Sequence, residues 1–310
     1  MILIVNLNLA VDHIVEVDGL RAGEVQRSRG TRQQAGGKGV NVARVLRTLE
    51  EPSLLLGFCG GRAGDLITEG LRAENIEALP TRVRAESRTC LIVNDHASRL
   101  QTVINAPGAL VSDAEWRDFE AIYTRELPRA ELVVINGSLP PNLPADTYAR
   151  LTAAAHKAGR RVLLDCAGAS LSHALGARPF LVKINAAEAA ELSAAPVAGF
   201  SGAASAASRL RERGAANVMI TLGGRGALFD FAGARYKFIA PEVRAVNSVG
   251  SGDAALAGLA AALLRGETAA EAGVLAVAAG SANALHGMGE CSAAEIAEMR
   301  ERVRYETGEF

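Results

Sequence analysis

The sequence predicts a doubly wound α/β protein whose sheet is mainly parallel and which carries a small β-sheet lid. From about residue 129 onward, short apolar segments alternate with amphipathic segments of helical period. This alternation is typical of a parallel sheet with helices on both faces. Two other segments, about 12–33 and 82–105, alternate polar and apolar residues with a period of two. They are too polar for buried central strands, so they predict a smaller sheet outside the main one.

The elements of the main sheet follow in chain order. Short runs rich in Val, Leu and Ile predict strands at 3–5, 54–56, 132–135, 162–164, 180–182, 218–221 and 227–229. Stretches of helical period predict helices at about 40–49, 64–73, 146–158, 186–193, 201–213 and 254–264. Because this pattern runs along most of the chain, we expect residues 1–310 to form a single domain with the lid inserted in it.

The two polar segments resemble antiparallel hairpins attached to the main sheet. Hairpins outside the core, joined to it by short crossings, can form a lid that closes over a ligand and excludes water. A solvent-exposed meander or a dimer interface is the alternative interpretation, and one sheet could serve as both lid and interface. We therefore expect a homodimer that forms through the lid.

Composition and charge exclude several classes of protein. The 310 residues are 49% hydrophobic and 22% charged, with a formal net charge of −1, which argues against a nucleic-acid or anionic-membrane partner. The apolar run 254–264 is shorter than the ~20 residues that cross a bilayer. The apolar N-terminus lacks the features of a signal peptide, and the cysteines have neither zinc nor disulfide spacing. We expect a cytoplasmic protein with reduced thiols.

The most informative motif is Val249-Gly-Ser-Gly-Asp253, which directly precedes the apolar helix expected at 254–264. Free N–H groups and the positive end of the helix dipole favour an anion at such a turn, and glycines let it approach the backbone. A carboxylate beside a bound phosphate suggests a base that takes a proton from an attacking hydroxyl. The alternative is an ordinary first turn in which Asp253 complements the dipole.

A second glycine-rich motif, Gln34-Ala-Gly-Gly-Lys-Gly-Val-Asn-Val-Ala-Arg44, opens the first long helix. Its glycines offer backbone donors, Lys38 adds a positive charge, and Asn41 follows one turn later. The order of residues differs from a Walker A loop, which has Ser or Thr after the lysine. The motif favours a loop that faces a phosphate or a polyol, with a plain glycine turn as the alternative.

Weaker motifs follow at the ends of later strands, where ligands bind in open α/β sheets. In Lys183-Ile-Asn-Ala-Ala-Glu188, the amide and the carboxylate would share one helix face and could hold Mg²⁺ through waters, or they could simply cap the helix. Thr221-Leu-Gly-Gly-Arg-Gly-Ala227 predicts a turn between two strands. Asn136-Gly-Ser-Leu-Pro-Pro141 and Asp165 also follow strands.

In order and spacing, these motifs resemble the PfkB family of sugar kinases, which have the ribokinase-like fold. The resemblance covers nearly the whole chain and rests most strongly on residues 36–44 and 249–253. Within the family, Ser87-Arg-Thr89 and the segment 136–141 are similar to the phosphosugar branch. That branch comprises 1-phosphofructokinases, tagatose-6-phosphate kinases and minor 6-phosphofructokinases.

The resemblance implies a role for each motif. Asp253 would deprotonate the sugar hydroxyl, and the N–H groups of Gly250, Ser251 and Gly252 would hold charge on the transferred phosphoryl group. Substrate would be bound by Asp12, Gly37, Asn41 and Ser138, and its existing phosphate by Lys38 and Arg88. ATP would be bound by Lys183, Asn185, Thr221, Gly223, Gly226, Ser248 and Asn283. Glu188 would order Mg²⁺ through water.

The chain departs from the pattern of the family at a few positions. Asn247-Ser248 replaces the usual Asp-Thr, and Ser251 replaces the usual Ala but keeps its backbone donor. Ile184 stands where the phosphosugar branch often has Pro, which would loosen the turn that presents Asn185. The segment after Asn8 also lacks a common Pro, which leaves Lys38 and Arg88 as the phosphate ligands that can be assigned.

The resemblance therefore implies ATP-dependent phosphoryl transfer to a phosphorylated ketohexose, with fructose 1-phosphate as the expected substrate and fructose 1,6-bisphosphate as the product. Tagatose 6-phosphate, fructose 6-phosphate, an unphosphorylated sugar and a nucleoside are the alternatives within the fold. Outside it, a non-catalytic sugar-phosphate sensor has no need of the carboxylate at Asp253. A Rossmann dehydrogenase would need a Gly-x-Gly-x-x-Gly spacing that residues 57–64 lack.

Overall fold

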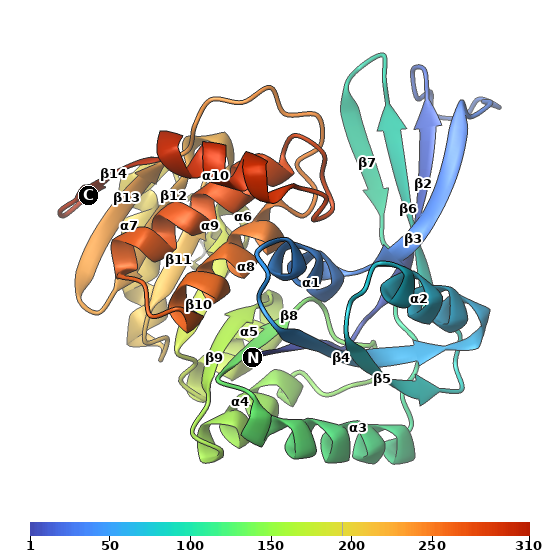
Figure 1. Cartoon of the computed structure of the whole chain (residues 1–310), viewed down its shortest axis with the longest axis horizontal. Helices are drawn as coiled ribbons and strands as arrows, with labels where there is room; N and C mark the ends of the chain where they lie inside the picture. The colour runs from blue at the N-terminus through green and yellow to red at the C-terminus, as the bar shows by residue number, and fades with distance from the viewer. Residues whose placement is uncertain (194) are drawn as a thin grey trace.

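The computed structural model describes residues 1–193 and 195–310 (Figure 1). Within these residues the chain forms a ten-stranded sheet and a separate four-stranded sheet. This arrangement confirms the predicted doubly wound α/β fold with a smaller sheet attached. In the described part of the chain, none of the helices combines the length and the apolar character that a membrane span requires.

The main sheet has a parallel centre and an antiparallel edge. Its strands lie in the order β14 (Arg304–Thr307), β13 (Ala234–Ile239), β12 (Ala227–Phe231), β11 (Val218–Thr221), β10 (Leu181–Asn185), β9 (Arg161–Asp165), β8 (Leu132–Asn136), β1 (Ile2–Asn6), β4 (Ser53–Gly60) and β5 (Ala78–Val83). From β11 to β5 each strand is parallel to its neighbour, whereas β12, β13 and β14 pair antiparallel. The predicted turn between β11 and β12 is confirmed.

Helices cover both faces of this sheet because its strands bury apolar side chains on both sides. In β1, Ile2 and Ile4 join the core on one face, and Leu3 and Val5 join the core on the other. The first face carries α1 (Lys38–Thr48), α2 (Gly61–Ala73), α8 (Ser251–Leu264), α9 (Ala269–Asn283) and α10 (Ala293–Arg302). The second face carries α3 (Asp113–Glu126), α4 (Thr147–Lys157), α5 (Gly168–Gly176), α6 (Ala186–Ser193) and α7 (Gly199–Glu212).

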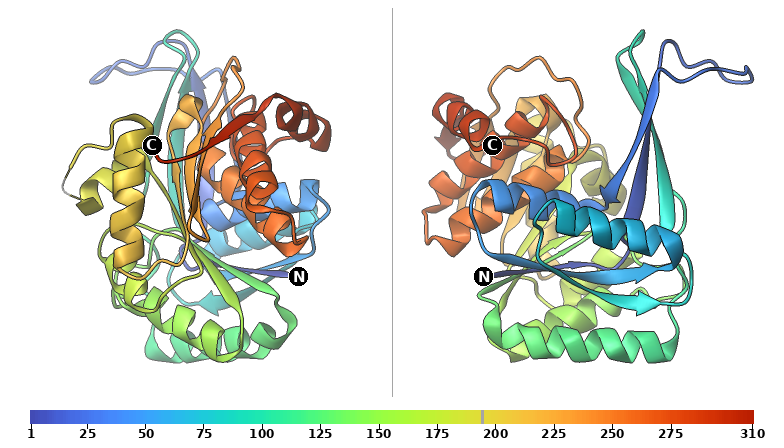
Figure 2. Two further views of the ribbon diagram at one scale, coloured as in Figure 1. Left: turned by 90° about the vertical axis from the view of Figure 1, so that its left-hand side faces the viewer. Right: turned by 45° about the vertical axis from the view of Figure 1, so that its right-hand side comes forward.

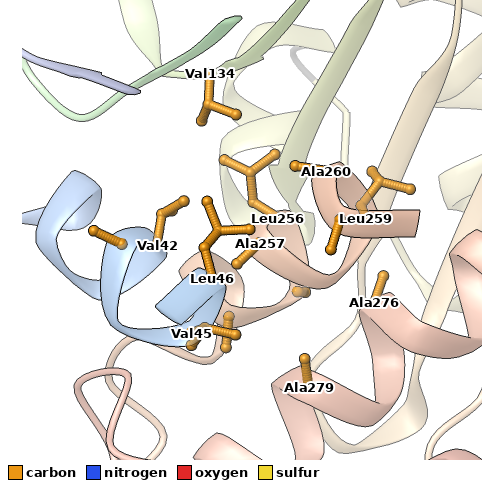
Figure 3. Packing of buried hydrophobic residues seen from close by; sticks show 14 of the residues in the cluster. Val42, Val45, Leu46, Val134, Leu256, Ala257, Leu259, Ala260, Ala276 and Ala279 are labelled. Carbon is orange, nitrogen blue, oxygen red and sulfur yellow. The ribbon is translucent and has the colours of Figure 1, made fainter. Parts of the chain in front are cut away.

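Helices α1, α8 and α9 pack side by side through small and branched apolar residues (Figure 3). Val42 and Leu46 of α1 lie against the row of α8 that contains Leu256 and Ala257. At Gly258 the two later helices approach so closely that a Cβ atom would lie 2.7 Å from the carbonyl oxygen of Leu275. This packing fixes the first turns of α1 and α8 relative to each other, and both turns carry residues of the candidate site.

The smaller sheet stands apart from the main body (Figures 1 and 2). Its strands lie in the order β3 (Gly30–Gly36), β2 (Ala10–Val17), β6 (Arg88–Asp95) and β7 (Leu100–Ile104). The two predicted hairpins are present, because β2 pairs antiparallel with β3 and β6 pairs antiparallel with β7. They are joined into one sheet by the parallel pairing of β2 with β6.

The bounds of the predicted lid need one correction. Residues 82 and 83 do not belong to it, because they lie in β5 at the edge of the main sheet. The sheet is also less polar than its sequence indicates, since Ile14 and Ile92 are buried in a small cluster with Met288. The lid sheet therefore has an apolar contact with the loop that follows α9.

Candidate active site

A cavity of about 1320 Å³ opens between the carboxyl ends of the parallel strands and the lid sheet. Its wall combines residues that follow β1, β8, β10 and β11 with residues of β6 and β7. This is the edge at which open α/β sheets bind ligands. Pockets for one drug-sized ligand usually measure about 300–1,000 Å³, so this cavity has room for two ligands side by side.

Nearly all of the residues predicted from the sequence line this cavity. On the side of the lid and α1 they are Asp12, Gly37, Lys38, Asn41, Arg88 and Ser138. Around β10, β11 and α8 they are Lys183, Asn185, Glu188, Thr221, Gly223, Gly226, Ser248, Gly250, Ser251, Gly252 and Asp253. The fold therefore gathers at one cavity motifs that lie far apart in the sequence.

The expected contact of Asn283 with a nucleotide is not supported by its position. Asn283 is fully buried and is not part of the cavity wall. Its Nδ2 donates to the carbonyl oxygen of Val249 and to Oγ of Ser251, both at 3.0 Å, and its Oδ1 accepts from the N–H of Gly289 at 2.7 Å. These bonds satisfy the amide of Asn283 within the protein. Asn283 therefore supports the glycine-rich turn instead of facing the cavity.

Asp253 lies in the first turn of α8, which begins directly after a left-handed residue. Gly250 has a φ of 82°, a conformation that glycine adopts without steric cost. The carboxylate of Asp253 is buried and accepts a hydrogen bond from Nδ2 of Asn41 at 2.8 Å. Burial raises the pKa of Asp253 to about 6, although Lys38 and Lys183 oppose the shift. Asp253 therefore has the pKa of a group that accepts a proton near neutral pH.

Two lysines share one buried carboxylate next to this turn. Asp165, at the end of β9, accepts from Nζ of Lys38 at 2.7 Å and from Nζ of Lys183 at 2.5 Å. Burial disfavours the charge of Asp165, but the two lysines outweigh it and lower its pKa to about 2. Burial also opposes the charge of Lys38, yet Asp165, Asp253 and Glu188 raise its pKa above the ordinary value. The two lysines and Asp165 together therefore keep one net positive charge at the cavity, which favours an anion.

The lid contributes Asp12 from β2 and Arg88 from the start of β6. Burial raises the pKa of Asp12 to about 6, against the opposing charges of Arg44 and Arg88. Arg88 donates to the carbonyl oxygen of Asn8 at 3.2 and 2.9 Å and to that of Ala106 at 3.3 Å. These two carbonyls lie on the segments that enter and leave the lid sheet, so Arg88 also fastens the base of the lid.

The turn at 183–188 is a helix start closed by two reciprocal hydrogen bonds. The N–H of Glu188 donates to Oδ1 of Asn185, and the N–H of Asn185 donates to Oε2 of Glu188, both at 2.9 Å. This is the capping arrangement that the sequence analysis offered as the alternative to a magnesium site. The expected loosening at Ile184 is not seen, because Ile184 is fully buried and the turn is closed.

Few side chains of the site are available to hold Mg²⁺. Within the part of the chain that the structure describes, no three His, Cys, Asp or Glu side chains form a metal-binding group. Both oxygens of Asp165 are bonded to lysines, whereas Oε1 of Glu188 faces the cavity 3.7 Å from Nζ of Lys38. One carboxylate oxygen of this kind fits a Mg²⁺ ion that keeps its waters and is held mainly by phosphates.

Asn6 is a residue of the site that the sequence analysis missed. It ends β1, lines the cavity, and accepts a hydrogen bond at Oδ1 from the N–H of Gly39 at 2.9 Å. A Cβ atom at Gly37 would lie 2.5 Å from the same oxygen, and Gly37 has a φ of 120°. The signal was present in the sequence, since Asn6 is a polar residue at the carboxyl end of the first buried strand.

The chain is similar to known proteins over most of its length. A model of the family described as pfkB family carbohydrate kinase matches residues 2–292. The chain is 35% identical to the 1-phosphofructokinase of Bacillus subtilis over 284 residues, or 92% of each chain. It is 39% identical to the 1-phosphofructokinase of Xanthomonas campestris over 274 residues, or 86% of this chain and 85% of the relative. The solved structure of Escherichia coli phosphofructokinase-2 in complex with substrates and products has a TM-score of 0.90 at 27% identity, covering 97% of this chain and 98% of that chain.

Proposed function

Since the chain belongs to the pfkB family of carbohydrate kinases, we propose that it transfers the γ-phosphoryl group of ATP to a hydroxyl of fructose 1-phosphate. The observation that carries this proposal is the position of Asp253. Its carboxylate lies in the same cavity as the N–H groups of the 250–252 turn and the ammonium group of Lys38. The names of the two relatives from Bacillus and Xanthomonas favour fructose 1-phosphate over other phosphosugars.

In the proposed reaction, the sugar hydroxyl oxygen attacks the γ-phosphorus of ATP. A new O–P bond forms, the bond between the γ-phosphorus and the bridging oxygen breaks, and ADP leaves. Asp253 accepts the proton of the hydroxyl, because burial gives it a pKa near neutral pH. The backbone N–H groups of Gly250 and Gly252 would hold the charge on the transferred group, as expected at a helix N-terminus. The N–H of Ser251, which the sequence analysis also expected to contribute, donates to the carbonyl oxygen of Ser248 at 3.1 Å.

Substrate binding is assigned to the side of the cavity that faces the lid. The side chains of Asp12 and Asn41 would form hydrogen bonds with sugar hydroxyls. Lys38 and Arg88 would hold the phosphate that the substrate already carries, since fixed cations bind phosphate oxygens strongly. Asn8 and Ser138 support this wall, because Nδ2 of Asn8 donates to Oγ of Ser138 at 2.9 Å.

The nucleotide is assigned to the other side of the cavity. There ATP would lie against Thr221, Gly223, Gly226 and Ser248, with Lys183 and Asn185 near its phosphates. Mg²⁺ would be held by the phosphates and, through water, by Glu188. When bound, it would neutralise charge on the phosphates during transfer.

A homodimer through the lid is the proposed assembly. One of the two edge strands of the lid, β7, exposes Leu100 and Ile104, which are 69% and 56% accessible. An edge strand with exposed apolar residues is a template for pairing with another sheet, and a second copy of this chain offers the same surface. Light scattering of the native protein and of Ile104→Lys would test this, since a dimer through the lid should become a monomer in the variant.

A screen that measures ADP release would test the proposed substrate. Fructose 1-phosphate, fructose 6-phosphate, tagatose 6-phosphate, fructose, ribose and adenosine would each be offered with MgATP. We expect the highest kcat/KM for fructose 1-phosphate. Preference for another phosphosugar would correct the substrate alone, whereas activity on unphosphorylated sugars or nucleosides alone would contradict the assignment of Lys38 and Arg88.

A further inference from the structure

Arg44 is a buried residue of α1 to which the proposed reaction gives no role. It is 3% exposed, and its guanidinium group makes bonds to several elements at once. Nε and Nη2 donate to the two carboxylate oxygens of Glu74, at 2.6 and 2.7 Å. Nη2 also donates to the carbonyl oxygen of Ala35 at 2.7 Å, and Nη1 donates to that of Met288 at 3.1 Å. Arg44 is thus held at the end of β3, at the end of α2 and at the loop after α9.

The same Nη1 also faces the side chain of Asn41, one turn earlier on the helix. The distance from Nη1 of Arg44 to Oδ1 of Asn41 is 3.3 Å. A guanidinium group has donors only, so the atom of the amide that faces it must be the oxygen. The amide nitrogen then points the other way, to Oδ2 of Asp253 at 2.8 Å.

Asp253 imposes the same orientation from the other side. An ionised carboxylate accepts hydrogen bonds and donates none, so it also needs the amide nitrogen of Asn41. A flipped amide would place its oxygen against the carboxylate of Asp253 and its nitrogen against the cation of Arg44. Both contacts would be repulsive, and Arg44 therefore locks the amide in the orientation that an ionised Asp253 requires.

We propose that Arg44 is a positioning residue for the reaction, which holds the amide of Asn41 so that it donates to the carboxylate of Asp253, with Glu74 holding Arg44 in turn. This inference rests on the proposed role of Asp253 as the base. It assigns to Arg44 an effect on the base that is transmitted through Asn41 rather than by contact with the substrate.

Other charged groups around Asp253 shift its pKa through their charge, which is separate from the hydrogen bond that Asn41 donates. Lys38 on α1, Lys183 on β10 and Asp165 on β9 act on Asp253 through charge. The amide of Asn41 donates a hydrogen bond to the carboxylate of Asp253, and this bond favours the ionised form of Asp253. Loss of this bond should raise the pH at which the base loses its proton.

The test measures kcat/KM against pH for the full-length protein and for Arg44→Met, Arg44→Lys and Glu74→Gln. In Arg44→Met and Glu74→Gln we expect the acidic limb of the profile to move up by about half to one pH unit, the size of a modest change in hydrogen bonding. At pH values below the midpoint of the limb, kcat/KM would then be about three- to tenfold lower than in the native protein, and above the midpoint the loss would be smaller. Arg44→Lys should lie between Arg44→Met and the native protein, because lysine keeps a donor but not the planar fork.

Glu126→Gln is the matched control for Glu74→Gln. Glu126 is a buried carboxylate of α3 that accepts from Arg125 at 2.8 Å and from Arg129 at 2.7 Å, and it lies outside the cavity wall. The Glu126→Gln variant should have a lower melting temperature than the native protein, but the acidic limb of its pH profile should not move. Glu74→Gln also keeps the proposal testable if Arg44→Met does not fold, because Glu74 is only partly buried.

A double-mutant cycle with Asn41→Ala separates the two routes by which Arg44 could act. Arg44 also lowers the pKa of Asp12 through its charge, and that effect would persist without Asn41. If Arg44 acts through Asn41, Arg44→Met should move the limb less in the Asn41→Ala background than in the native background, because only the effect on Asp12 is left. An equal shift in both backgrounds, or a uniform loss of activity at all pH values, would overturn the proposal. Normal turnover by Asp253→Asn would instead overturn the proposed base.

Discussion

Nδ2 of Asn41 lies 2.8 Å from Oδ2 of Asp253, although the two residues are 212 positions apart. Each belongs to one of the two glycine-rich motifs, and each lies in the first turn of a helix. Because α1 and α8 pack directly on each other, the contact joins the proposed sugar-binding turn to the proposed base.

Replacing Asp253 with Asn should lower kcat by about 10²–10⁴-fold, the range usually found for a general base. Binding of ATP should change little, because the backbone donors of the 250–252 turn remain. Steady-state kinetics and equilibrium titration with ATP would measure both quantities. Asp118→Asn, on the exposed face of α3, is the control and should behave like the native protein. An Asp253→Asn variant with native kcat would show that another group takes the proton.

The pH dependence of activity should reflect the same carboxylate. Its pKa is raised from 3.8 to about 6 by burial, so kcat/KM should fall as the pH drops through 6 and the base becomes protonated. Asp12 has a pKa raised to about 6 as well, so the limb should be steeper than expected for one proton. A limb centred below pH 5 would contradict the buried environment of both carboxylates.

Stability should show the opposite dependence on pH. A carboxyl group whose pKa is raised in the folded state favours folding while it is protonated, and this contribution is lost as pH rises from 3.8 to about 6. Asp253→Asn should therefore have a higher melting temperature than the native protein, and the difference should be larger at pH 8 than at pH 5. Thermal unfolding at both pH values measures this, and an equal difference at both would contradict the assigned ionisation.

Lys38→Ala should weaken binding of the phosphosugar more than it weakens binding of ATP. Nζ of Lys38 is held at the cavity by Asp165 at 2.7 Å, and a fixed ammonium group is an effective ligand for phosphate. We expect KM for fructose 1-phosphate to rise at least about tenfold, as for the loss of a charge-assisted hydrogen bond. Lys157→Ala, at an exposed position of α4, should leave KM unchanged. Equal losses for both substrates would place Lys38 between the two ligands.

Gly39→Ala should destabilise the protein, although it replaces glycine by alanine within a helix. The new Cβ atom would lie 2.5 Å from Cβ of Asn6 and 3.1 Å from Oδ1 of Asn136, so β1 and α1 would have to separate. Gly176→Ala in α5 meets nothing within 4 Å and should stabilise the protein by about 0.5 kcal/mol. Urea unfolding of both variants would show whether the free energy of unfolding falls in Gly39→Ala and rises in Gly176→Ala.

Much of the fold and the site could be predicted because the relevant signals are local. Alternation of apolar strands and amphipathic helices is visible over short windows along most of the chain, and the motifs around Lys38 and Asp253 lie within single turns. Helix α3 was missed even though Ser112 and Glu115 form a capping box at its start. A capping box of this kind is a local signal that the sequence carries.

The remaining features depend on contacts between distant segments. The pairing of β2 with β6, which joins two hairpins into one sheet, has no trace in either hairpin alone. The burial of Asn283 was equally hidden, because an asparagine near a glycine-rich turn has the same pattern whether it binds a ligand or holds the backbone. The sharing of Asp165 by Lys38 and Lys183 likewise requires three separate elements to be placed in space.

The close packing of α8 against α9 limits which amino-acid substitutions this chain can tolerate. The helix that carries Asp253 is supported by a layer of buried residues such as Ala257, Ala260, Ala276 and Ala279, and Gly258 has no room for a Cβ atom beside Leu275. A larger side chain anywhere in this layer would have to push the helices apart. Tolerance to substitution should therefore be low throughout this layer, although none of the residues just named lines the cavity.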